Sequence, residues 1–131
     1  MRGGYLLFLE LEKPSAIRIG RLGHWELPAG LYVYAGSGLR SVEARARRHL
    51  GKKRTKRWHI DYLTTKARTL DCIAFESERR IECDLARSME SLGGKHLIGG
   101  FGSSDCKCES HLLYLGGLRV TSIHDDRSGH A

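Results

Sequence analysis

The hydrophobic residues of this chain fall into short runs that are typical of β-strands. The first run, at residues 4–12, is almost continuously apolar. Later segments group or alternate Leu, Ile, Val and Tyr, which predicts five strands in all, over residues 4–12, 16–21, 31–35, 69–77 and 111–115. Residues 22–30 contain Gly23, Pro28 and Gly30, so we expect a loop there.

Three other segments have the character of helices. Residues 42–50 repeat apolar positions on one face and follow Ser41, which is suited to an N-cap. We interpret residues 58–63 as a second helix and predict a third over residues 78–92, which ends before Gly93. The third helix has apolar residues at core spacing: Ile81, Leu85, Met89 and Leu92. Together these elements predict an α/β domain of the α+β type, in which helices flank a small, mainly antiparallel sheet.

The length and composition indicate a single soluble domain. We expect it to span residues 1–119, followed by a polar and flexible tail at 120–131. Hydrophobic residues make up 40% of the 131 positions, and no apolar run approaches the ~18 residues that would indicate a membrane span. The first residues do not resemble a signal peptide, so we expect no membrane association and a cytoplasmic location.

The positive charge is concentrated in one segment. The whole chain carries +7, whereas residues 40–57 hold nine Lys or Arg and a single acid, Glu43, for a local charge of +8. Such a segment favours nucleic acid as the partner, because it neutralises phosphates and releases counterions. A solvated basic face remains the alternative. The candidate nucleic-acid-binding residues are Arg40, Arg47, Arg48, Lys52, Lys53, Arg54, Lys56 and Arg57.

A tyrosine beside a glycine-rich stretch provides the candidate chemistry. Tyr34 precedes Gly-Ser-Gly at residues 36–38, where we expect a sharp turn, and Arg45 and His49 follow on the predicted helix. Arg45 could hold a phosphate through two hydrogen bonds, and His49 could orient it or carry a proton. Arg47 and Arg48 are alternatives to Arg45. These groups near one turn suggest phosphodiester chemistry.

Hydrolysis of a phosphodiester also requires an activated water and stabilised phosphoryl charge. Tyr5 or Tyr34 could accept the proton if its pKa were lowered, although both tyrosines could simply pack on the sheet. Glu82 could hold Mg²⁺ or Mn²⁺, which would contact a phosphate oxygen. Glu82 could instead complement the helix dipole, and Glu78 is a rival metal ligand.

The four cysteines offer a weak signal for a second metal. Cys106, Cys108 and His111 form a Cys-x-Cys-x-x-His pattern, with Cys83 or Cys72 as a fourth ligand. This pattern lacks the usual Cys-x-x-Cys pair, so we favour buried thiols over a structural zinc site. For Asp105 with His111, local capping in the turn is the simpler explanation. We expect His59 and Asp61 to support the fold or the DNA groove rather than to do chemistry.

The chain resembles the GIY-YIG nuclease superfamily. The two signature tripeptides correspond to Gly3-Gly4-Tyr5 and Tyr34-Ala35-Gly36, separated by an extra strand and loop. The nearest resemblance is to a branch long listed as a domain of unknown function. It rests on Trp-His-Ile-Asp-Tyr-Leu at 58–63, Glu-Cys-x-Leu-Ala at 82–86 and Phe-Gly-x-Ser-Asp-Cys-x-Cys-x-x-His-Leu at 101–112.

The resemblance implies a nuclease fold and a catalytic set that consists of Tyr5, Tyr34, Arg45, His49 and Glu82. We therefore expect a metal-dependent endonuclease that cleaves DNA, with RNA as a further possible substrate. Without a module that reads bases, low sequence specificity or structure-selective cutting is expected, with a role in DNA repair or recombination. The alternative is a nucleic-acid-binding module that kept the fold and the basic face but lost turnover.

Overall fold

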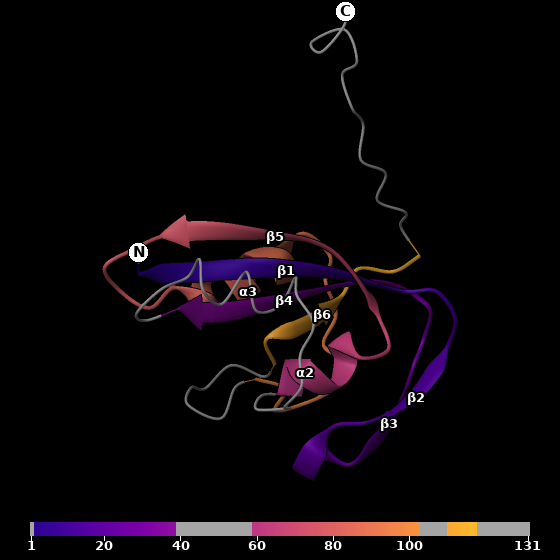
Figure 1. Ribbon diagram of the computed structural model, residues 1–131. Coiled ribbons are helices and arrows are strands. Elements are labelled where there is room, and N and C mark those ends of the chain that lie inside the picture. Colours follow the sequence, from indigo (N-terminus) through magenta and orange to yellow (C-terminus); the bar gives the residue numbers. More distant parts are fainter. Residues whose placement is uncertain (1, 39–58, 103–109, 118–131) are drawn as a thin grey trace, which may run out of the picture.

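The computed structural model describes residues 2–38, 59–102 and 110–117 of the chain. The described part is an α+β fold built on a four-stranded antiparallel sheet with the strand order β5-β1-β4-β6 (Figure 1). A separate two-stranded sheet consists of β2 and β3. The predicted fold class is thus confirmed. Among the described residues, no helix is long and apolar enough to cross a membrane.

The central strand β1, Gly3–Leu11, pairs with β4, Gly30–Gly38, and on its other side with β5, Arg68–Glu76. Both faces of β1 are buried, which explains its nearly continuous apolar sequence. One side of the sheet, which we call the tyrosine face, carries the buried side chains of Tyr5, Leu7, Leu9, Tyr32 and Tyr34. The opposite side, the helix face, carries Leu6, Val33 and Ala35.

The helix α3, Glu82–Ser91, covers the helix face. In Figure 1 it lies behind the strands. It begins four residues later than predicted, because Ile81 at its N-cap has a non-helical backbone. Its Ala86 is buried and Leu85 and Met89 pack on the sheet, but the expected core position Leu92 is 74% exposed. Leu92 is the C-cap residue beyond the last helical turn, so the prediction of core burial at this position was wrong.

The tyrosine face packs on α2, His59–Thr64, through the buried residues Ile60 and Leu63. The last strand, β6, Leu112–Tyr114, pairs with residues 32–34 of β4 and closes that side of the sheet. Both elements lie within two residues of their predicted bounds. The helix predicted over residues 42–50 falls outside the described residues.

The hairpin between β1 and β4 corrects one prediction. Residues 22–30 were expected to be a loop, but His24–Leu27 form the strand β3, which pairs with β2, Ser15–Arg18. A short 3-10 turn, Gly20–Leu22, joins the two strands. The alternation of polar His24 with apolar Trp25 was the missed signal, obscured by the flanking glycines. Figure 1 shows this hairpin extending away from the main sheet.

Candidate functional site at one end of the sheet

Two of the predicted site residues, Tyr5 and Tyr34, are neighbours on adjacent strands. Tyr5 of β1 lies directly opposite Gly36 of β4, so Tyr34 is its diagonal neighbour on the same face. Their ring centroids are 6.1 Å apart, with an interplanar angle of 52°. Tyr5 is 1% exposed and Tyr34 is 7% exposed, so both rings are held in a packed environment. The structure therefore brings together the two tyrosines that the sequence places 29 positions apart.

Gly36 has a different role from the predicted one. A turn was expected at residues 36–38, but all three continue β4, and neither of the two glycines has a positive φ. A Cβ atom on Gly36 would lie 2.1 Å from Cζ of Tyr5 and 2.3 Å from its hydroxyl oxygen. The glycine is needed here because the ring of Tyr5 crosses over the backbone of β4.

A second aromatic contact joins Tyr34 to the turn at Phe101 and Gly102. The ring centroid of Phe101 lies 5.9 Å from that of Tyr34, in an edge-on arrangement. It lies 5.6 Å from the ring centroid of His59. Gly102 has a φ of +68°, and a Cβ there would lie 2.9 Å from Cε1 of Tyr34. The turn at Phe101 and Gly102 thus packs directly against Tyr34, and residue 102 must be a glycine for this packing.

His59 is held by the same turn. Its Nδ1 accepts a hydrogen bond of 2.9 Å from the backbone N–H of Gly102. Burial lowers the pKa of His59 below its usual value, which favours the neutral ring. Since Nδ1 is the acceptor, the neutral ring carries its proton on Nε2. These contacts agree with the expectation that His59 supports the fold.

Glu82 is buried at the start of α3. Its carboxylate is 7% exposed, and Oε1 accepts a hydrogen bond of 2.9 Å from Nε of Arg80. Within the described residues, its other oxygen, Oε2, has no hydrogen-bond partner. A buried carboxylate oxygen without a partner carries a desolvation cost. By contrast, Glu78 is exposed. Of the two acids considered as metal ligands, Glu82 is therefore the buried one.

His111 lies beside Glu82 and contacts the neighbouring Cys83. Its Nε2 is 3.5 Å from Sγ of Cys83, and the ring is 3% exposed. Burial lowers the pKa of His111, and the charge of Glu82 opposes this effect. The backbone of His111 donates to the carbonyl of Phe101 and accepts from the N–H of Ala35. Of the two cysteines considered as a fourth zinc ligand, Cys83 is the one whose contact with His111 the described residues show.

The tyrosines and Glu82 reach the same end of the sheet from opposite faces. Tyr5 lies near the start of β1 on the tyrosine face. On the helix face, Ile81, which precedes Glu82, packs so closely over Gly4 that a Cβ there would lie 2.9 Å from its Cγ1. Within the described residues, no hydrogen bond or ion pair joins Glu82 to either tyrosine.

Several predicted site residues lie outside the described residues. They include two of the proposed catalytic residues, the basic segment and the cysteines of the possible zinc site: Arg40, Arg45, Arg47, Arg48, His49, Lys52, Lys53, Arg54, Lys56, Arg57, Cys106 and Cys108. Over residues 2–38, 59–102 and 110–117, no group of three or more His, Cys, Asp or Glu side chains is arranged to hold a metal ion.

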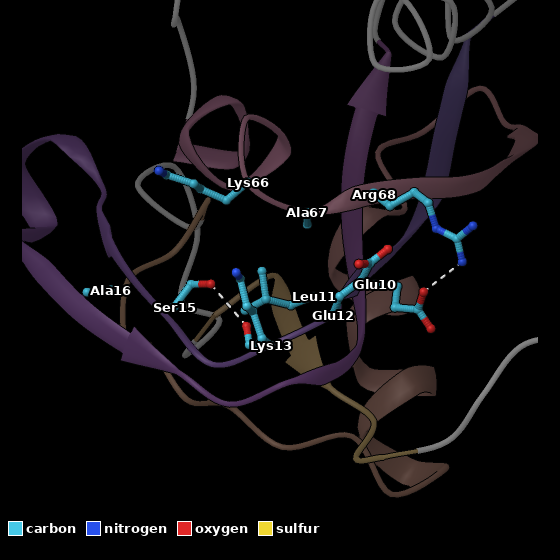
Figure 2. A pocket seen from close by; sticks show the side chains of 9 residues that line it. All are labelled: Glu10, Leu11, Glu12, Lys13, Ser15, Ala16, Lys66, Ala67 and Arg68. Carbon is cyan, nitrogen blue, oxygen red and sulfur yellow. Dashed lines mark hydrogen bonds and ion pairs between the residues drawn. The ribbon is translucent and has the colours of Figure 1, made fainter.

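A pocket of about 590 Å³ lies at the other end of β1 (Figure 2). It is lined by residues of β1, β2 and the turn after α2, including Leu11, Ser15 and Lys66. Leu11 is six residues beyond Tyr5, or roughly 20 Å along a strand. Arg68 in the lining is paired with Glu10 at 2.7 Å, and Figure 2 shows Lys66 and Arg68 extending in different directions. The pocket is therefore separate from the tyrosine pair.

The fold and the site together define a small α+β domain with a pair of cross-strand tyrosines and a buried glutamate at one end of its sheet. The chain belongs to the family described as Domain of unknown function DUF123, whose sequence profile matches residues 4–125. No curated protein and no solved structure matches the chain.

Proposed function

We propose that the chain is a metal-dependent endonuclease that hydrolyses DNA phosphodiester bonds and is related to the GIY-YIG nucleases. The observation that carries this proposal is the placement of Tyr5 beside Tyr34. The two tripeptides that contain them lie on paired strands, and Tyr5 of the first is directly opposite Gly36 of the second, although residues 12–29 separate the strands in sequence. The close approach of Tyr5 to Gly36 gives the second tripeptide a physical requirement for its glycine.

Glu82 is suited to hold a divalent cation such as Mg²⁺ or Mn²⁺. These ions prefer carboxylate oxygens, and Oε2 of Glu82 is a buried oxygen without a partner among the described residues. Arg80 binds the other oxygen, Oε1, and so fixes the orientation of the carboxylate. When bound, the ion would stabilise the charge that develops on the phosphoryl oxygens and the leaving group.

The remaining roles fall to Tyr5 and to residues known from the sequence alone. In the proposed mechanism Arg45 holds the phosphate, Tyr5 in its deprotonated form accepts a proton from the attacking water, and His49 orients the phosphate. The basic segment at residues 40–57, with its charge of +8, holds the nucleic-acid backbone. Backbone contacts carry no sequence information, so we propose structure-selective cutting in DNA repair or recombination, in the cytoplasm.

One observation favours a second candidate, a nucleic-acid-binding module without turnover. Tyr5 is 1% exposed, which suits a packing role better than proton transfer to a solvent water. This candidate keeps the basic segment and predicts salt-sensitive binding of DNA or RNA. It predicts no metal-dependent product.

The experiment that tests the proposal measures nicking of supercoiled DNA, and cleavage of branched DNA and RNA, with Mg²⁺ or Mn²⁺. We expect Glu82→Ala and Arg45→Ala to abolish cleavage while binding, measured by fluorescence anisotropy, largely survives. Glu78→Ala is the matched control, because it removes an exposed acid four residues before Glu82 and should change neither quantity. Cleavage retained in both variants would contradict the site. Binding without cleavage in the unaltered protein would favour the second candidate.

A further inference from the structure

We propose that the chain forms a two-fold symmetric dimer in which β5 pairs with β5 of a second copy, so that the two sheets become one. Within the described residues, β5 is the edge strand of the sheet and pairs with β1 on one side alone. Every residue of its second half, residues 73–76, is exposed. This inference concerns an interaction surface and is independent of the proposed nuclease activity.

The apolar residues on this edge are unusual for a strand that faces water. Ile73 is 45% exposed and Phe75 is 37% exposed, and they are two of the three large hydrophobic residues exposed in the described part. Both point to the helix face, because Ile73 lies opposite Leu6 and Phe75 opposite Gly4. Natural edge strands are commonly protected by charge, proline or a bulge. The pairing of β1 with β5 has an irregularity between Phe8 and Leu9. It lies near the start of β5, so the second half of β5 pairs regularly.

The order of residues in this half suits pairing with itself. Residues that lie opposite each other in an antiparallel pair point to the same face of the sheet. The register between the two copies of β5 can therefore shift only in steps of two residues. A register centred on Ala74 places Ile73 opposite Phe75 of the second copy and Phe75 opposite its Ile73. Both exposed side chains then gain an apolar cross-strand partner.

The neighbouring registers are less favourable. A register centred on Ile73 places Phe75 opposite Asp71 of the second copy, and one centred on Phe75 places Ile73 opposite Ser77. In the register centred on Ala74, Asp71 lies opposite Ser77 and Glu76 opposite Cys72, so no like charges oppose each other there. These pairings favour a second copy of this chain as the occupant of the edge.

The proposed dimer would bring the two candidate sites together. Tyr5 lies directly opposite Ala74 in the β1–β5 pairing. The two-fold axis would lie between the two copies of β5, so one strand, β5, would separate Tyr5 from it. Neighbouring strands are ~4.8 Å apart, which puts the two Tyr5 residues about 14 Å apart on the same face of one continuous sheet.

Sedimentation equilibrium of the full chain tests the interface. We expect a dimer for the unaltered protein and a monomer for Phe75→Glu, which places a charge in both apolar pairs. Leu92→Glu is the matched control, because it adds the same charge at an exposed apolar position outside the strand and should leave the dimer intact. Circular dichroism checks that each variant is folded.

A cysteine crosslink tests the register without disturbing the apolar pairs. Ala74→Cys puts two thiols opposite each other at the two-fold axis, so mild oxidation should give a covalent dimer that survives denaturation. Thr69→Cys, five residues from the axis, should not crosslink. A monomer at all concentrations would overturn the proposal. A dimer that persists in Phe75→Glu and is not crosslinked through residue 74 would overturn it as well, since it would use another surface.

Discussion

Replacement of Gly36 by alanine tests the central geometric inference, that the ring of Tyr5 occupies the space over this glycine. The new Cβ would lie 2.1 Å from Cζ of Tyr5, whereas an ordinary contact is at least 3.4 Å. The ring or the strand must therefore move by about 1.3 Å. Tyr5 is 1% exposed and packs against Tyr34, so little free space is present to absorb this shift.

The expected loss of stability for Gly36→Ala is about 3 kcal/mol, the upper part of the range for an overpacked core. For a chain of this size, that corresponds to a fall in Tm of about 10 °C. Urea and thermal unfolding measure both quantities. Gly99→Ala is the control, because a Cβ on Gly99 meets no atom within 4 Å, so its stability should change by less than about 0.5 kcal/mol.

A double-mutant cycle identifies the cause of the loss. Tyr5→Val removes the ring that the new methyl group would strike, although it leaves a cavity of its own. If the clash is with this ring, Gly36→Ala should cost at least ~1.5 kcal/mol less in the Tyr5→Val background than in the unaltered protein. Equal costs in both backgrounds, or a Gly36→Ala variant as stable as the Gly99→Ala control, would refute the geometry.

Two further predictions concern individual side chains. Tyr5→Phe removes only a hydroxyl, so the unfolding free energy should fall by about 1 kcal/mol. If Tyr5 accepts the proton, Mg²⁺-dependent nicking should fall at least ~100-fold. Nicking within a factor of three of the unaltered protein would exclude that role. His59 has a lowered pKa in the folded state, so the unfolded chain binds its proton first as the pH falls, and stability should decrease below about pH 6.5. In His59→Asn, whose side-chain oxygen can still accept from the N–H of Gly102, this part of the pH dependence of Tm should disappear, and an unchanged profile would contradict the assignment.

Much of the fold could be predicted from the sequence because its strands have strong local patterns. β1 and β5 were found within one residue of their predicted ends, and α2 was displaced by one. The predictions failed at the ends of elements, which local patterns define poorly. Residues 36–38 look like a turn in isolation, but pairing with β1 keeps them extended as far as Gly38. Leu92 has the spacing of a core residue, yet the helix has already ended there.

For the candidate site, the sequence predicted individual residues better than the contacts between them. The sequence singled out Tyr5, Tyr34 and Glu82 by their residue types and by resemblance, and two of the three are in contact. It could not show that His111 contacts Cys83, or that Gly102 donates to His59, because 28 and 43 positions separate these pairs. The motif at residues 101–112 contained a signal, since it begins with Phe101, whose ring packs on Tyr34, and ends with Leu112, which lies opposite Tyr34 in the β4–β6 pairing.

The positions of Tyr5 and Glu82 restrict how a nucleic acid could reach both. Tyr5 is buried within the tyrosine face, and α3 covers the helix face, so a substrate cannot meet the two groups by lying flat on either side of the sheet. The two faces come together at the end where β1 begins and β4 finishes, and Ile81 brings the start of α3 to that end. A phosphate that contacts both groups must therefore approach this end. Cleavage that is lost in both Tyr5→Phe and Glu82→Ala would be explained by this approach, whereas cleavage that depends on Glu82 alone would place the substrate on the side of α3.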